Sequence, residues 1–70
     1  MVNMIPVASS NIKSVGYNPQ TSELFVTFHY GKTYIYSNVP SSKFESLLNS
    51  GSKGSYLESF IKGVHPYRPY

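Results

Sequence analysis

The sequence contains no cysteine, no tryptophan and no aspartate. The absence of cysteine excludes disulfides, thiolate metal sites and a cysteine nucleophile, so packing alone must hold the core. A chain of 70 residues forms one small domain, which buries only about 60% of its unfolded surface. Aromatic residues make up 16% of the chain, with seven Tyr and four Phe, and are expected to supply much of the buried area.

Few side chains in this sequence could carry out chemistry. The acids are Glu23, Glu45 and Glu58, and the histidines are His29 and His65. The acids fall on a predicted loop and on the outer faces of predicted helices, so they form no carboxylate pair or triad. Two distant histidines without cysteine or aspartate do not make a ligand set for zinc or calcium. The sequence therefore predicts a protein that is not an enzyme and holds no metal or cofactor.

Long hydrophobic runs are also missing. No segment approaches the roughly 20 apolar residues needed to cross a bilayer, and the first residues lack the charged start of a secretion signal. We therefore expect a cytoplasmic protein without membrane contact. Six Lys and Arg against three acids give a net charge of +3 and a pI near 9.3. This balance favours an anionic partner, although such a charge is also ordinary for a solvated surface.

The first part of the chain is rich in β-branched and aromatic residues, which favour strands. Strands are predicted over residues 11–17, 24–30 and 33–37, with turn residues Asn18-Pro19 after the first. Residues 1–8 are expected to form a flexible leader, because Pro6 interrupts a short apolar stretch. Residues 64–70 contain two prolines and are expected to form an extended tail over the surface.

The hairpin between the last two strands has two possible registers. A three-residue loop ending at Gly31 pairs Val26 with Tyr34 and places Tyr36 on the same face. A two-residue loop of Gly31-Lys32 would turn both tyrosines to the opposite face. The three-residue loop is favoured, because glycine is then at the position that requires positive φ.

After Pro40 the apolar spacing changes to three and four residues, which predicts helices. The apolar stripe of the first helix is Phe44, Leu47 and Leu48, with Ser42 and Glu45 spaced as a capping box and Gly51 as a stop. The stripe of the second helix is Tyr56, Leu57, Phe60 and Ile61, with Ser52 or Ser55 as its cap, Ser55 and Glu58 as a second capping box, and its end before Gly63. The predicted fold is therefore α+β: a three-stranded antiparallel meander followed by two short C-terminal helices packed on one face.

The segment from Gly51 to Ser55 is a candidate anion site. It directly precedes a predicted helix, so its backbone N–H groups, the helix dipole and Lys53 could hold a phosphate or carboxylate. The spacing of a nucleotide-binding P-loop is absent. A glycine that ends one helix, followed by a serine that caps the next, explains the same residues and is the favoured interpretation.

The tyrosine pair has two interpretations. Tyr34 and Tyr36 could stack on unpaired bases while Lys32 and Lys53 hold the phosphates. In the favoured register, however, both rings pack beneath the helices, so a core role is the preferred interpretation.

The opposite face of a three-stranded sheet would then carry Phe25 and Ile35 without a cover. An apolar patch of this kind predicts a protein partner or a homodimer formed through the sheet. This is the alternative function.

The order of SSNIKSVGY, LFVTF, GKTYIYSNVP, FESLL and SKGSYLESFIK resembles the KTSC domain, named after the C-terminus of some lysyl-tRNA synthetases. The resemblance covers about residues 9–63 and includes Tyr34-x-Tyr36, Val39-Pro40 and Ser52-x-Gly54. The family occurs as a tail on some synthetases and as free-standing small proteins of bacteria and phages, and this chain resembles the free-standing form.

The role suggested for the family implies RNA binding here. Together with the positive charge and the aromatic strand, it leads to the hypothesis of a non-enzymatic module that binds RNA, a nucleotide or another phosphate-bearing ligand. The residues expected to bind it are Lys32, Tyr34, Tyr36, Ser52, Lys53 and Gly54.

Overall fold

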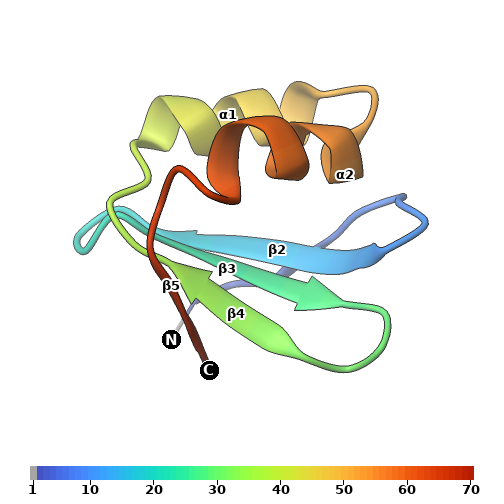
Figure 1. Ribbon diagram of the computed structural model, residues 1–70, viewed down its shortest axis with the longest axis horizontal. Coiled ribbons are helices and arrows are strands. Elements are labelled where there is room, and N and C mark those ends of the chain that lie inside the picture. The colour runs from blue at the N-terminus through green and yellow to red at the C-terminus, as the bar shows by residue number, and fades with distance from the viewer. Residues whose placement is uncertain (1) are drawn as a thin grey trace.

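The computed structural model describes residues 2–70, which form a five-stranded antiparallel sheet with helices on one face (Figure 1). The strands lie in the sheet in chain order, and each pairs with the next. They are β1 (Ile5–Pro6), β2 (Ile12–Asn18), β3 (Glu23–Phe28), β4 (Thr33–Tyr36) and β5 (Tyr67–Pro69). The helical elements are α1 (Ser41–Asn49), α2 (Lys53–Tyr56) and a π-helical turn, η1 (Leu57–Ile61), that continues α2.

The β3–β4 hairpin has the favoured register. Val26 pairs with Tyr34 and Leu24 with Tyr36. The amide of Gly31 donates to the Phe28 carbonyl at 2.9 Å, and Gly31 has φ of 100°, which a side chain rarely tolerates. The three-residue loop is therefore confirmed, and it directs both tyrosines toward the helices.

The prediction of three strands was too low, because both ends of the chain join the sheet. Ile5 pairs with Val15 of β2, and Tyr67 pairs with Tyr36 of β4. Strand β1 has two residues and β5 has three, and each contains a proline. Segments this short show too little alternation of apolar and polar residues to indicate strands. The chain ends that the sequence assigned to a leader and a tail thus supply the two edges of the sheet.

Helix α1 begins two residues earlier than its expected capping box requires. Its N-cap is Pro40, whose carbonyl accepts from the amides of Lys43 and Phe44 at 2.9 and 3.4 Å. The pairing of Ser42 with Glu45 as a capping box is therefore wrong, because neither residue occupies its position in that motif.

The second helix has its N-cap at Ser52, so the expected box of Ser55 and Glu58 is also wrong. The Ser52 hydroxyl donates to the Ser55 hydroxyl at 3.0 Å and does not cap the backbone. Phe60, expected in the apolar stripe, is 51% exposed, whereas Leu57 and Ile61 are buried. The π-helical turn widens the backbone here and turns Phe60 out of the stripe.

The core lies between the sheet and the helices (Figure 1). It is a cluster of apolar side chains, each at most 4% exposed. Its members are Ile12, Val15, Leu24, Val26, Phe28, Tyr36, Val39, Leu47, Leu57 and Ile61. The prediction that both helices pack on the face of β3 that carries Leu24 and Val26 is confirmed, since burying this face removes most of the large apolar area from water.

The other face of the sheet is not open, contrary to expectation. Ile35 is only 4% exposed, and the ring of Tyr70 meets Phe25 edge-on with centroids 5.7 Å apart. A Cβ atom built on Gly16 would lie 2.5 Å from Val2 and 2.7 Å from Met4, so the N-terminal segment passes directly over β2. The C-terminus lies below the sheet in Figure 1. The exposed patch that suggested a partner or homodimer is thus covered by the chain itself.

An ion pair holds β5 in place. The Arg68 guanidinium donates to the Glu23 carboxylate at 2.7 Å, across the sheet from β5 to β3. This hydrogen bond, with one from Thr21, holds the pKa of Glu23 below its usual value. The Tyr70 amide donates to the Thr33 carbonyl at 3.0 Å and extends the pairing beyond β5. Within residues 2–70, no helix is long and apolar enough to span a bilayer.

Substitution of Gly16 tests how tightly the N-terminal segment packs on the sheet. We expect Gly16→Ala to lower the free energy of unfolding by about 1–3 kcal/mol, because the new methyl group overlaps the Asn3 backbone as well as two side chains. Gly51→Ala is the matched control, since nothing lies within 4 Å of a Cβ there. Urea unfolding of both variants measures the difference, and equal stability would show that the segment does not pack against β2.

Candidate functional site

An aromatic pocket of about 310 Å³ opens beside the end of η1, between that turn and strands β3 to β5. It is lined by Phe28, Tyr30, Tyr34, Tyr36, Lys62, Gly63 and Tyr67. Its size lies at the lower end of the range for small-ligand sites, and its lining combines rings, hydroxyls and one ammonium group. Such a lining suits a flat ligand with polar edges.

The rings of the pocket form a continuous series. Tyr30 stacks on Phe28 at 5.6 Å between centroids and with planes 18° apart. Phe28 and then Tyr67 meet Tyr34 edge-on, at 6.0 and 5.6 Å. Tyr67 also contacts Tyr36 at 5.8 Å. The series joins the hairpin loop, β4 and β5, so the pocket forms only when the C-terminal strand is paired.

The structure separates the two tyrosines of the Tyr-x-Tyr pair. Tyr36 is 3% exposed and belongs to the core, and burial raises its pKa to about 12. Tyr34 is only half-buried and packs against the core from the pocket side. Tyr30 and Tyr67, at 69% and 64% exposed, flank it. A hydrogen bond with Tyr34 raises the pKa of Tyr30 above its usual value.

Lys62 supplies the positive charge at the pocket. Its ammonium nitrogen lies 5.5 Å from the centre of the Phe28 ring and 2.9 Å from the Glu58 carboxylate. Glu58 and Lys62 are four residues apart on the helical segment, a spacing that favours this ion pair. The lysine is thus oriented over the aromatic series while its side chain stays partly exposed.

A second cavity, a polar groove of about 560 Å³, lies between the loop that precedes β2 and the start of the second helix. Its lining residues are Ala8, Ser9, Ser10, Asn11, Gly51, Ser52, Lys53, Gly54, Ser55, Glu58 and Ser59. The Asn11 carboxamide oxygen would lie 2.7 Å from a Cβ on Gly54, so a larger residue at position 54 would force the Asn11 side chain to move. Asn11 is held by the Ser9 hydroxyl, which donates to its carboxamide oxygen at 2.9 Å.

The charges in the groove differ from those of a phosphate loop. The Lys53 ammonium donates to the Ser50 carbonyl at 3.0 Å, beyond the end of α1. The Glu58 carboxylate forms part of the same wall. Hydroxyl and amide groups therefore dominate the groove, and its one lysine is engaged by backbone.

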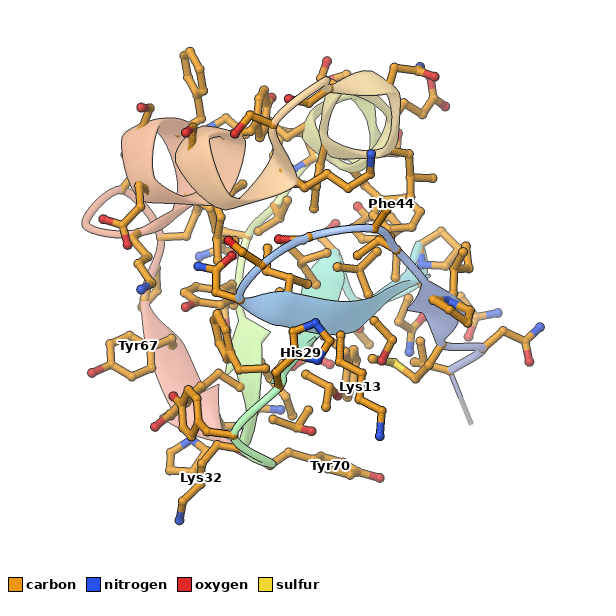
Figure 2. All side chains as sticks on the ribbon, turned by 90° about the vertical axis from the view of Figure 1, so that its right-hand side faces the viewer. Lys13, His29, Lys32, Phe44, Tyr67 and Tyr70 are labelled. Carbon is orange, nitrogen blue, oxygen red and sulfur yellow. The ribbon has the colours of Figure 1, made fainter. Side chains whose placement is uncertain are left out.

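The residues predicted from sequence fall into three places. Tyr34 and Tyr36 line the aromatic pocket, and Ser52, Lys53 and Gly54 line the polar groove. Lys32 projects from the hairpin tip, below Tyr67 in Figure 2, and lines neither cavity. Their assignment to ligand binding stays a prediction.

Sequence reasoning missed several lining residues, among them Tyr30, Lys62 and Tyr67 in the pocket and Asn11 and Glu58 in the groove. The four-residue spacing of Glu58 and Lys62 was a readable sign of an ion pair. No local sequence pattern indicates that Glu58 or Lys62 lies near a tyrosine.

The sequence model of the KTSC domain matches residues 8–67. The chain is 39% identical over 59 residues to a protein of Tsukamurella paurometabola, a match that spans 84% of this chain and 88% of the relative. The crystal structure of a KTSC domain protein from Yersinia pestis superposes with a TM-score of 0.94 at 34% identity, and covers 100% of this chain and 99% of that one.

A further relative is a much longer protein, the lysine–tRNA ligase of a Nostoc species. It is 43% identical over 58 residues, which span 83% of this chain but 10% of the ligase. A domain of this sequence type therefore occurs both alone and as a small part of a synthetase.

Burial of Tyr36 predicts an alkaline loss of stability. The pKa of Tyr36 is about 12 in the folded protein against about 10 when exposed, so the folded state holds the proton longer. The contribution of the protonated Tyr36 to the free energy of unfolding is fully present below pH about 10, and it is lost as the pH rises toward 12. Urea unfolding between pH 9 and 11.5, chosen as roughly the range of this titration, should show a steeper decline for the wild type than for Tyr36→Phe. Identical slopes would place the Tyr36 hydroxyl in water.

Proposed function

The chain belongs to the KTSC domain family, and from the site that its residues form we propose that it is a non-enzymatic module that binds single-stranded RNA. The observation that carries the proposal is the aromatic pocket, in which exposed rings of Tyr30 and Tyr67 flank Tyr34 beside the Lys62 ammonium. Proteins bind unpaired bases by stacking them on aromatic side chains and holding the phosphates with cations. The relationship to a domain of lysine–tRNA ligases supports an RNA ligand.

In the proposed complex, an unpaired base enters the pocket and lies against Tyr67 or Tyr30. Both rings are mostly exposed, so they can be covered by a base without leaving the core. Tyr34 meets Phe28 and Tyr67 edge-on, and in this proposal its hydroxyl bonds to a base edge. In this proposal Tyr36 packs in the core, where it is 3% exposed, and Tyr34 contacts the base.

Two lysines are proposed to hold the phosphates. Lys62 lines the pocket, and Lys32 extends from the hairpin tip, below Tyr67 in Figure 2. Their charge makes binding depend on salt, because each neutralised phosphate releases bound counterions. The overall charge of +3 favours the encounter with RNA in the same way.

Protein interaction through the sheet face is the weaker candidate. Its motivation was an exposed patch of Phe25 and Ile35, but Ile35 is only 4% exposed and the Tyr70 ring packs edge-on against Phe25. Salt separates the two functions, since an apolar protein contact weakens little with ionic strength while RNA binding weakens steeply.

Two tyrosines of the C-terminal end form a matched pair for testing the pocket. Tyr67 is the first residue of β5 and lines the pocket, whereas Tyr70 follows β5 and lies away from Tyr67 (Figure 2), and both side chains are mostly exposed. We expect Tyr67→Ala to weaken binding of a short single-stranded RNA by about 1–3 kcal/mol, the contribution of one stacked base. Tyr70→Ala should change it little. Fluorescence anisotropy at low salt measures both, and urea unfolding checks that both variants fold.

Salt dependence provides a second readout. Lys62→Gln should reduce the slope of log K against log salt by about 0.7, the contribution of one phosphate contact on a single strand. If wild-type protein bound no RNA at low salt, or if Tyr67→Ala and Tyr70→Ala weakened binding equally, the proposal would be wrong.

A further inference from the structure

The polar groove has the chemistry of a site for hydroxyl groups rather than phosphate. Its walls carry serine hydroxyls and the Asn11 carboxamide, each of which can both donate and accept hydrogen bonds. Glu58 also lines the groove, and its carboxylate, which pairs with Lys62, can only accept hydrogen bonds. Lys53, the one lysine in the lining, is held by the Ser50 carbonyl at 3.0 Å. A neutral ligand that donates and accepts, such as a sugar, matches this lining.

The groove and the aromatic pocket meet at a single ion pair. Glu58 lines the groove, Lys62 lines the pocket, and their charged atoms lie 2.9 Å apart. The π-helical turn that contains Glu58 and precedes Lys62 therefore separates the two cavities by one turn of backbone. Turns of this kind are rare and are frequent at functional sites.

We propose that the groove binds the ribose hydroxyls of the nucleotide next to the base in the aromatic pocket. The proposal rests on the function proposed above and names its substrate class as RNA rather than DNA. The Asn11 carboxamide and the Ser55 hydroxyl face the sugar from the two walls, and the Glu58 carboxylate accepts a hydrogen bond from the ribose. An acidic side chain accepts from a ribose hydroxyl in the same way in dinucleotide sites.

The groove is shaped for this ligand by close packing of its walls. Asn11 and Gly54 approach so closely that a methyl group on Gly54 would collide with the Asn11 carboxamide. Asn11 is oriented by the Ser9 hydroxyl, and Ser55 by the Ser52 hydroxyl, through hydrogen bonds of 2.9 and 3.0 Å. The polar groups are thus arranged before the ligand arrives, which lowers the entropic cost of binding.

A free sugar carries the same kind of hydroxyl groups as the ribose of RNA, so the experiment uses both ligands. The affinities of one short single-stranded RNA, its DNA counterpart and methyl riboside are measured for the wild type, Asn11→Ala, Ser55→Ala and Tyr67→Ala. Ser46→Ala, an exposed serine of α1 outside the groove, is the matched control. Anisotropy reports on the oligonucleotides, and amide shifts of the groove residues report on the riboside.

We expect the wild type to prefer RNA to DNA by about tenfold, as one or two net hydrogen bonds provide. Asn11→Ala and Ser55→Ala should each reduce this preference by roughly threefold or more and leave DNA binding unchanged. Tyr67→Ala should weaken RNA and DNA alike. The control should match the wild type.

The outcomes separate the two proposals. Equal binding of RNA and DNA, still dependent on Tyr67, would overturn the ribose site and leave RNA binding through the pocket intact. Absence of binding to either oligonucleotide would overturn both. Saturable shifts with methyl riboside but no preference for RNA would assign the groove to a free sugar and overturn its role in RNA recognition. Amide shifts of the groove residues on addition of inorganic phosphate would also overturn the ribose site.

Discussion

The positive φ of Gly31 is the constraint on which the rest of the structure depends. It closes the three-residue loop that pairs Val26 with Tyr34, and the period of two along β4 then carries Tyr36 to the same face. A shift of one residue would turn both rings away from the helices, removing Tyr36 from the core and Tyr34 from the pocket. One backbone conformation therefore determines both the packing of the domain and the position of its candidate site.

The two ends of the chain complete the sheet on either side of β2, β3 and β4. Their contribution could not be predicted, because β1 and β5 are short strands with prolines that pair only when β2 and β4 are already in place. The middle of the chain was predictable, since long runs of β-branched and aromatic residues and the helical stripe around Leu47 depend on local spacing. The burial of Ile35 was not predictable, because the groups that cover its face of the sheet come from residues far away in the sequence.

The candidate site, like the fold, could be predicted only in part from the sequence. The Tyr-x-Tyr pair and the Ser52-x-Gly54 segment stand out in the sequence, and each lines a cavity. Which lysine accompanies the tyrosines was not predictable, because Lys62 reaches the pocket through a π-helical turn that no apolar pattern indicates. The resemblance to the KTSC domain supplied the fold family and suggested RNA as a ligand, but it did not indicate how the lining residues come together in space.

RNA binding by the aromatic pocket is the central claim, and an amide NMR titration of the labelled protein with a short single-stranded RNA tests it most directly. At low salt, the account predicts saturable shifts that cluster on residues 28–36 and 62–67, and that diminish as salt is raised. Shifts confined to the N-terminal segment and Tyr70, or a spectrum that RNA leaves unchanged at low salt, would contradict it.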